Sequence, residues 1–172
     1  MSNFDAASYA RSGNMYFACN QANKATTALS TTATGLILYN PWGSGKKLVI
    51  VQAVFAFSAV PTAAGAVMLS MSNTPSSAAV PAGTADTIWA ADGSGPSTNS
   101  VARVFTIATT NIVNVYVAPL VAASSTSAST AGLNIPEGSI VVVPGAHIQF
   151  SHVTTVATGI GSFLWAEVPE RN

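Results

Sequence analysis

From residue 35 onward, short apolar runs rich in β-branched residues alternate with clusters of Gly, Pro, Asn and Ser. This pattern is typical of β-strands separated by turns. No stretch shows the 3.6-residue period of an amphipathic helix, and no repeat of fixed length occurs. We therefore predict an all-β domain, an antiparallel β-sandwich or jelly roll. Its strands are predicted over residues 35–39, 47–57, 66–72, 101–108, 112–121, 139–143, 146–153 and 160–168.

Two of these runs also indicate which faces are buried. The run 47–57 is apolar on both faces, which is expected where one face meets the core and the other meets a second layer or subunit. The run 112–121 alternates valine with polar or aromatic residues, which predicts a strand with one buried face. In 47–57 the predicted faces are Val49, Val51, Phe55 and Phe57 against Leu48, Ile50 and Val54; in 112–121 they are Val113, Val115 and Val117 against Asn114 and Tyr116.

The first 34 residues differ from the remainder of the chain. They are rich in Ala, Asn, Ser and Thr, and their periodicity is weak. We interpret residues 1–34 as an extended N-terminal arm that is ordered where it docks on the body or a neighbour, and residues 35–172 as the sandwich domain. The Pro, Gly and Ser-rich excursion 73–100 indicates a contacting loop or short strands hidden in it. The Ala/Ser/Thr tract 122–130 is interpreted as a flexible tip.

Composition narrows the class of protein. The 172 residues suit one domain or a domain with an arm, and 49% apolar residues with a mean hydropathy of +0.42 argue against disorder. Only 7% of residues are charged, and the net charge is zero, so no basic footprint for nucleic acid or an anionic membrane is present. The uncharged stretch 48–85 is interrupted by Pro, Gly and Asn too often to span a bilayer, and residues 1–11 lack the apolar core of a secretion signal.

Small, weakly polar side chains are the most abundant among the uncharged residues. Ala, Ser and Thr make up 68 of the 172 residues. A second chain can approach such a surface with little charge desolvation and little loss of side-chain entropy, which favours permanent assembly over a lone monomer.

The candidate motifs for catalysis or cofactor binding lack the residues or the spacing that such sites require. The turn 43–47 resembles a phosphate-binding loop, but the spacing requires Gly where Asn40 stands and Ser or Thr where Lys47 stands. His147 and His152 lie five apart on one predicted strand, so they point to opposite faces and cannot share a metal. Cys19 is alone, which favours a buried small hydrophobe over a reactive thiol. We predict no enzyme activity, no metal site and no cofactor.

Aromatic residues are the better candidates for function. Trp42, at a Pro-Trp-Gly turn, is either an anchor for a partner or packs back over its own strand. Trp89 lies between Asp86 and Asp92, an arrangement that is either a platform for a sugar or a solvated loop with the indole tucked beneath it. We predict that a partner is contacted by Phe4, Tyr9, Tyr16, Phe17, Trp42, Trp89 and the turn residues Lys46 and Lys47.

Four segments carry a resemblance to a known family. Residues 35–50 read Gly-Leu-Ile-Leu-Tyr-Asn-Pro-Trp-Gly-Ser-Gly-Lys-Lys-Leu-Val-Ile, and later segments read Ile-Pro-Glu-Gly (135–138), Val-Val-Pro-Gly (142–145) and Phe-Leu-Trp-Ala-Glu-Val-Pro (163–169). Together they resemble capsid decoration, or cement, proteins of tailed bacteriophages, which have a jelly-roll body.

The resemblance implies a structural virion protein on the outer surface of an icosahedral capsid. Its expected partners are the major capsid protein and copies of itself, often as a homotrimer over capsid junctions, with no nucleic acid and no membrane. The long excursion 73–100 and the polar segment 1–34 depart from the family's pattern. They leave open a receptor- or carbohydrate-binding β-module of a phage head fibre or tail.

Overall fold

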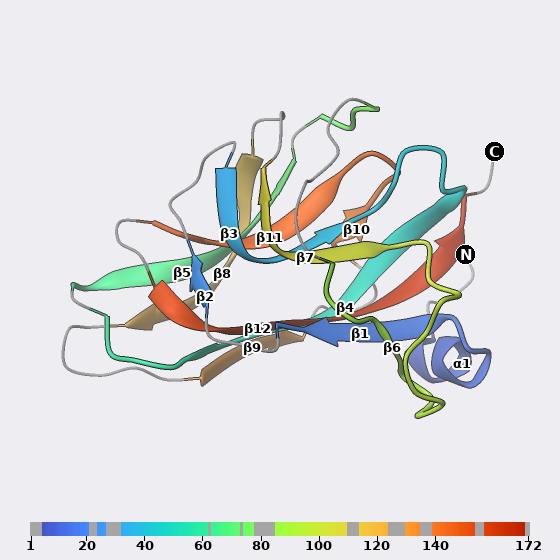
Figure 1. Cartoon of the computed structure of the whole chain (residues 1–172), viewed down its shortest axis with the longest axis horizontal. Helices are drawn as coiled ribbons and strands as arrows, with labels where there is room; N and C mark the ends of the chain where they lie inside the picture. Colours follow the sequence, from blue (N-terminus) through green and yellow to red (C-terminus); the bar gives the residue numbers. More distant parts are fainter. Residues whose placement is uncertain are drawn as a thin grey trace.

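The computed structural model describes residues 5–20, 24–26, 32–61, 63–72, 74–77, 85–109, 114–123, 130–134, 139–153 and 157–170. Within these ranges the chain forms two antiparallel β-sheets that face each other, with one short helix outside them. In Figure 1, β3, β11 and β7 form the upper layer, and β12, β1 and β9 form the lower one.

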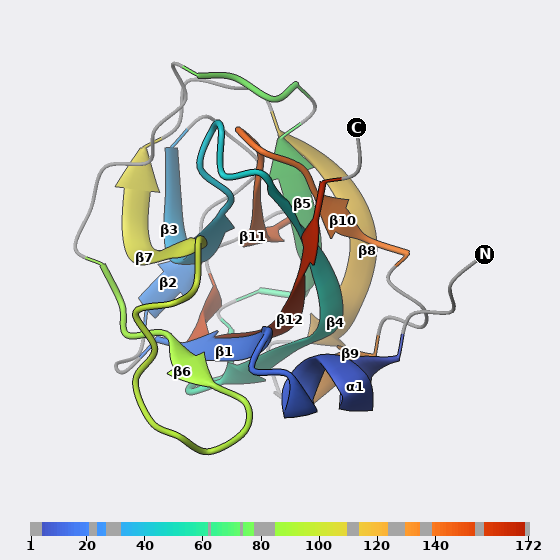
Figure 2. The ribbon, with the colours of Figure 1, turned by 90° about the vertical axis from the view of Figure 1, so that its right-hand side faces the viewer.

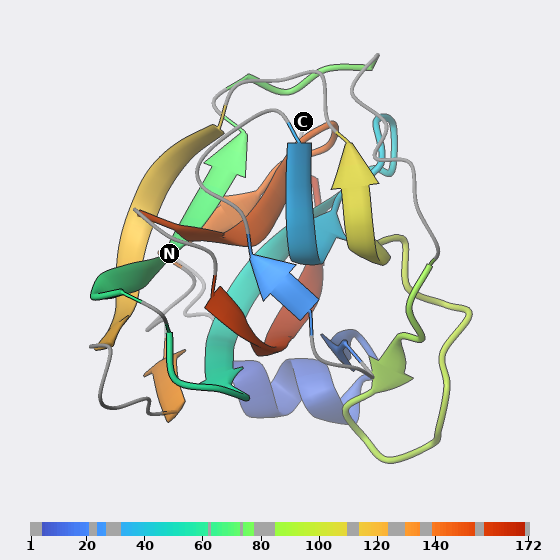
Figure 3. The ribbon, with the colours of Figure 1, turned by 60° about the vertical axis from the view of Figure 1, so that its left-hand side comes forward.

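The two sheets contain different numbers of described strands, seven and five. The first contains β1 (Met15–Cys19), β2 (Lys24–Thr26), β4 (Lys46–Phe57), β6 (Trp89–Ala90), β9 (Thr130–Asn134), β10 (Val141–Val142) and β12 (Ala157–Pro169). The second contains β3 (Thr32–Tyr39), β5 (Gly65–Ser72), β7 (Arg103–Thr109), β8 (Asn114–Ala123) and β11 (His147–His152). Figure 3 shows the second sheet in its order β8-β5-β11-β3-β7 from left to right.

The pairing of strands is that of a jelly roll. The first half of the chain pairs with the second half in reverse order: β1 with β12, β3 with β11, β4 with β9 and β10, and β5 with β8. Two further pairings, β4 with β12 and β5 with β11, join these pairs into sheets. A long antiparallel ribbon is thus rolled into a sandwich, which confirms the predicted fold class. The short strand β6, which lies within the excursion 73–100, pairs with β1 at one edge, and β7, predicted over 101–108, pairs with β3 at another.

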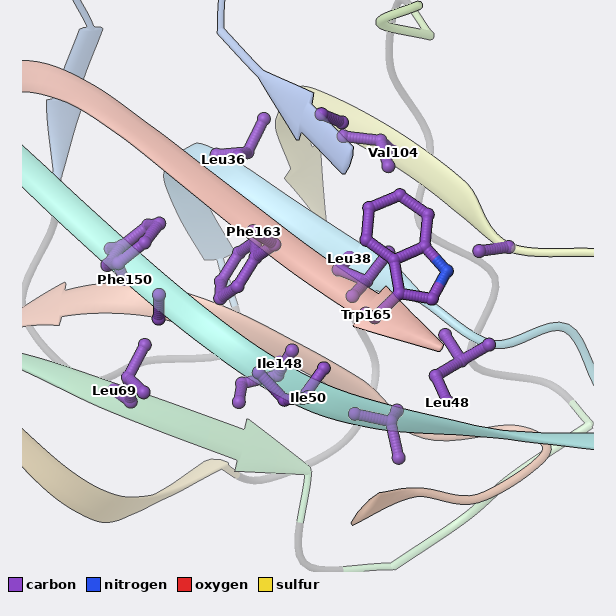
Figure 4. Packing of buried hydrophobic residues seen from close by; sticks show 14 of the residues in the cluster. Leu36, Leu38, Leu48, Ile50, Leu69, Val104, Ile148, Phe150, Phe163 and Trp165 are labelled. Atoms are coloured by element: carbon purple, nitrogen blue, oxygen red, sulfur yellow. The ribbon is translucent and has the colours of Figure 1, made fainter. Parts of the chain in front are cut away.

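The core lies between the two sheets and is rich in aromatic rings. Phe150 stacks on Phe163 with ring centroids 4.6 Å apart, and Phe55 lies 5.6 Å from Phe150. Trp165 is fully buried beside Tyr16. Figure 4 shows Phe150, Phe163 and Trp165 together with aliphatic side chains from both sheets, among them Leu38, Leu48, Ile50, Leu69 and Ile148. Burial of this cluster is the main driving force for holding the layers together.

A β-bulge changes the faces predicted for the long strand β4. Trp165 pairs with Ile50 and Leu164 pairs with Gln52, so Val51 is an extra residue without a partner on β12. A bulge shifts the alternation by one residue. The core-facing residues are therefore Leu48 and Ile50 before the bulge, and Ala53 and Phe55 after it. The prediction that placed Phe55 and Phe57 on the face of Val49 and Val51 is wrong for this reason, as is the grouping of Val54 with Leu48 and Ile50.

Strand β8 also presents a different face from the one that the alternation suggested. Val115 and Val117 are 41% and 38% exposed, whereas Ala118 and Leu120 pack against the core. The pairing of β8 with β5 shifts register twice, between Val67 and Met68 and again two residues later. Because each shift moves the alternation, the valine pattern alone does not identify the residues of β8 that meet the core.

The N-terminal segment is more structured in its described part than the predicted arm. Helix α1 (Ala6–Arg11) begins at Asp5, whose side chain accepts a hydrogen bond from the Ala7 N–H, and it packs outside the first sheet beneath β1 and β12 (Figure 2). Strand β1 lies inside that sheet, between β12 and β6, and buries Tyr16 and Ala18. These inward side chains complete the core, so the segment belongs to the sandwich. Residues 1–4 and 27–31 lie outside the described residues.

The other expectations for connecting segments are met only in part. In the Ala/Ser/Thr tract, strand β8 extends to Ala123 and strand β9 begins at Thr130, while residues 124–129 lie outside the described residues.

Within the described ranges the helix α1 has six residues, and no helix there is long and apolar enough to cross a membrane.

The two sheets lie so close together at Gly161 that adding a side chain there is predicted to destabilise the fold. A Cβ at this position would lie 2.5 Å from the ring of Phe150, which belongs to the facing sheet. Gly161→Ala should therefore lower the free energy of unfolding by about 1–3 kcal/mol through overpacking, as measured by urea denaturation. Ser162→Ala, one residue along on the opposite face, should change it by less than about 0.5 kcal/mol. Equal effects of the two changes would contradict this packing.

Candidate docking site

The connection between β3 and β4 presents a large aromatic side chain to solvent. It runs Asn40-Pro41-Trp42-Gly43-Ser44-Gly45, and Trp42 is 58% exposed. Gly43 and Gly45 have φ angles of +74° and +68°, a left-handed conformation that glycine adopts without strain. The tight turn therefore depends on the two glycines that follow Trp42.

Asn40 holds this turn in place. Its side-chain amide donates hydrogen bonds to the carbonyl oxygens of Lys46 (2.8 Å) and Val142 (2.9 Å), and its side-chain oxygen accepts one from the Ser44 hydroxyl (2.7 Å). Its backbone N–H donates to Ala146 O (2.9 Å), and its carbonyl accepts from Gly145 N–H (2.8 Å). Asn40 is completely buried. One residue thus ties both ends of the Trp42 turn to the neighbouring β10–β11 connection.

The Trp42 ring lies over that neighbouring turn. A Cβ at Gly145 would be only 2.5 Å from Cε3 of Trp42, so the absence of a side chain at Gly145 lets the indole rest on the backbone. Gly145 O also accepts a hydrogen bond from Ser76 N–H (3.1 Å), which brings the segment 74–77 to the same place. Of the two alternatives for Trp42, the structure shows packing on its own domain, and the ring is still half-exposed; its role as an anchor for a partner stays a prediction.

These segments enclose an open pocket of about 410 Å³. It is lined by Trp42, Gly43, Pro75, Val143, Pro144 and Glu170. Apart from Glu170, these residues have no polar side-chain group other than the indole N–H. Glu170 follows the end of β12, and its backbone N–H donates to Gly45 O (2.9 Å), so the carboxyl group is held at the Trp42 turn. The arrangement can hold an apolar group with a charge at one side.

Lys46 is one of the residues predicted to contact a partner, and its charge is already paired within the chain. Its ammonium group forms an ion pair with Glu167 Oε2 at 2.9 Å. Glu167 is buried, and its other oxygen accepts hydrogen bonds from the Ser100 hydroxyl (2.6 Å) and the Val101 N–H (2.9 Å). A buried carboxylate with these partners fixes the segment before β7 to the first sheet. Lys46 therefore has a structural role, because its charge compensates that of Glu167. Lys47 is partly exposed, pairs with Val168 along the strands, and forms no ion pair with a described residue.

The remaining predicted contact residues differ in how far their side chains are exposed. Phe17 on β1 lies opposite Trp89 on β6 and is 38% exposed, while Trp89 is partly buried. Tyr16 is buried against Trp165, and burial raises the pKa of its hydroxyl, followed by the charge of Glu167. The prediction that Tyr16 contacts a partner is thus wrong, since its side chain fills the core. Tyr9 lies on α1 and is partly exposed; Phe4 lies outside the described residues.

The carboxylates around Trp89 are engaged within their own segments. The Thr106 hydroxyl donates a hydrogen bond to Asp86, and Ser94 N–H donates to Asp92 Oδ1 at 2.9 Å. Hydrogen bonds from the Ser94 hydroxyl and N–H lower the pKa of Asp92 below its usual value. The structure therefore does not present Asp86 and Asp92 as a pair of free acceptors beside the Trp89 ring.

The two histidines lie on opposite faces of β11, as their spacing predicted. His147 shares a face with Gln149 and Ser151, and His152 follows Ile148 and Phe150 toward the core. Both are buried, and burial lowers the pKa of each imidazole, that of His147 to about 4. Cys19 is partly buried, and burial raises its thiol pKa. Among the described residues, no group of three or more His, Cys, Asp or Glu could hold a metal ion.

Comparisons with known proteins identify no family. No family model matches the chain. No curated protein matches it. Among solved structures, a chain from the structure of infectious bursal disease virus, strain Gx, aligns over 91% of this chain and 41% of its own length, at 13% identity and a TM-score of 0.21. A likeness of that size carries no argument about fold or function, so the function has to be argued from the site itself.

The hydrogen bonds of Asn40 predict its importance for the Trp42 turn. Asn40→Ala removes the donor for two buried carbonyl groups and should lower the free energy of unfolding by about 2–4 kcal/mol in urea denaturation. Asn14→Ala is the matched control, because the Asn14 amide bonds only within its own loop, to Ser12. That change should cost less than about 0.5 kcal/mol. A similar small effect at Asn40 would contradict its role.

Burial of His147 predicts a loss of stability in mild acid. Its pKa is about 4 in the folded protein and about 6.5 when unfolded, so the unfolded chain binds the extra proton between these values. Stability due to His147 is full above about pH 6.5 and falls as the pH drops toward 4, by about 3 kcal/mol in total. Urea denaturation between pH 7 and 4 measures this slope, which should flatten in His147→Gln. An NMR titration showing the His147 ring protonated at pH 6 would contradict it.

Proposed function

We propose that this chain is a structural virion protein that decorates the outside of an icosahedral phage capsid, contacting the major capsid protein and further copies of itself. The observation that carries the proposal is Trp42, half-exposed at a turn that Asn40 makes rigid, beside an apolar pocket. Its action is binding, with no turnover of a substrate.

Trp42 has the properties of an interface anchor. Tryptophan is enriched among the residues that contribute most binding energy, and a ring already held in place loses little conformational entropy on binding. The Asn40 hydrogen bonds and the contact with Gly145 supply that pre-organisation. An anchor of this kind suits a partner that is bound once and permanently.

The described surface supports assembly more broadly. Charges are few, and the Lys46–Glu167 ion pair uses two of them internally. Large apolar side chains that remain exposed in the described ranges are spread over both sheets and the turns: Phe17, Trp42, Val60, Val115, Val117, Val153 and Ile160. Obligate interfaces are more apolar than the average surface, so these side chains favour lasting contacts, including contacts between copies in a homotrimer.

Fold-level analogy is compatible with the proposal and with its alternative. Jelly rolls occur in viral capsid proteins and in lectins, and the fold alone does not decide between such functions. The alternative is a receptor- or carbohydrate-binding module of a head fibre or tail, centred on Trp89. It is less favoured because Asp86 and Asp92 are already bound by Thr106 and Ser94.

Co-sedimentation with empty capsid shells tests the proposal. Shells assembled from the major capsid protein of the same virus should carry the wild-type chain to the pellet. Trp42→Ala should weaken this binding at least tenfold, because it removes the anchor. Asp92→Asn is the control: it changes an exposed side chain in a loop that does not line the pocket beside Trp42, and it should bind like the wild type.

Light scattering of the free protein complements this experiment. A closed oligomer, with a trimer having three times the subunit mass of 17.4 kDa, is expected. A stable monomer that stays in the supernatant with every shell tested would contradict the proposed function.

A further inference from the structure

The pocket beside Trp42 has a chemistry that narrows what can occupy it. Its walls are the indole ring, Pro75, Val143 and Pro144, and its one charged group is the carboxylate of Glu170. No described residue accepts a hydrogen bond from the Trp42 ring nitrogen, so this donor is available to a ligand. An aromatic face, flanking prolines, an indole N–H and a carboxylate are the elements by which grooves recognise extended, proline-containing peptides.

We propose that this pocket binds an extended peptide segment of the partner protein, with a proline or aliphatic side chain on the Trp42 ring and a Lys or Arg beside Glu170. This inference rests on the proposed docking function, because it names the chemistry that the Trp42 end recognises. The ring nitrogen donates to a backbone carbonyl of the segment. The pocket's volume of about 410 Å³ lies within the usual range for ligand sites, about 300–1,000 Å³.

Charge complementarity selects a basic residue in the segment. Glu170 is exposed and forms no ion pair with any described residue. Lys46, on the neighbouring strand, is already neutralised by Glu167 and cannot compensate it. Among the described lining residues the charge of the pocket is therefore negative, which attracts Lys or Arg and disfavours Asp or Glu.

The lining favours a peptide over a glycan. A sugar presents many hydroxyl groups, and a site for it needs several polar side chains placed around the ring. Here the carboxylate of Glu170 is the only polar side-chain group besides the indole N–H among the lining residues. A proline-containing segment loses little entropy when it binds, since its extended conformation is already populated in the free state.

Peptide titration of the full chain, with tryptophan side chains labelled with ¹⁵N, tests this inference. The probe is an acetylated and amidated hexapeptide of sequence proline, proline, leucine, proline, proline, arginine. The indole signal of Trp42 should shift on titration, while that of the buried Trp165 should not. Replacing the arginine by glutamate in the peptide, or the prolines by glycine, should each weaken binding severalfold.

Variants of the chain assign the contacts. Trp42→Ala should reduce affinity tenfold or more, and Glu170→Gln about threefold, as expected for a partly solvated charge pair. The Glu170→Gln protein should also lose the preference for arginine over glutamate in the peptide. Asp92→Asn, which removes an exposed carboxylate from a loop that does not line the pocket, is the matched control and should bind like the wild type.

The outcomes separate this inference from the proposed function. No shift of the Trp42 signal at millimolar peptide, equal binding of the glutamate peptide, or a shift with maltohexaose in place of the peptide would each overturn the peptide site. If shells still bind in a Trp42-dependent manner in that case, the docking function stands with another recognition chemistry. Binding of the peptide without binding of shells would keep the site and remove the capsid as its partner.

Discussion

Eleven residue pairs join β4 to β12, and nearly every other part of the first sheet is attached to these two strands. β1 and β2 pair with the edge of β12 that faces away from β4, and β9 and β10 pair with the edge of β4 that faces away from β12. The inward side chains of this ladder, such as Phe55, Phe163 and Trp165, meet the second sheet and form the centre of the core. The bulge at Val51 keeps these large groups inward along both halves of β4. Without this ladder the first sheet would have no continuous face to bury against the second sheet.

One end of the same ladder supports the candidate site. Lys46 and Pro169 form its last pair, Glu170 follows immediately, and Glu167 lies two residues before that pair. The buried Glu167 carboxylate secures the segment before β7, while Asn40 secures the turn that leads into β4. The exposed indole is therefore mounted at one end of the longest strand pairing among the described residues. Rigid support of this kind lets a surface residue act as an anchor, because its geometry does not have to be organised during binding.

Much of the fold follows from local sequence pattern, whereas the site follows from tertiary arrangement. Alternating apolar runs and turn residues predict most strands, and the Pro-Trp-Gly turn identifies Trp42 as a candidate contact residue. The inward face of β4 could not be predicted, because a bulge is not visible in the alternation. The role of Lys46 depended on Glu167, 121 residues away in the chain. The pocket was equally hidden, since its walls come from four separate segments that meet only at the end of the sandwich.

The contact between Trp42 and Gly145 has a consequence for how this end of the molecule can change over time. Gly145 is doubly restricted, by a φ angle of +83° and by the indole that rests on it, so any side chain there is strained and also displaces the ring. Trp42 carries no comparable restriction, because its outer half faces solvent. Substitution of Trp42 during evolution is therefore compatible with the fold and would alter the proposed docking surface, whereas Gly145 has to stay a glycine.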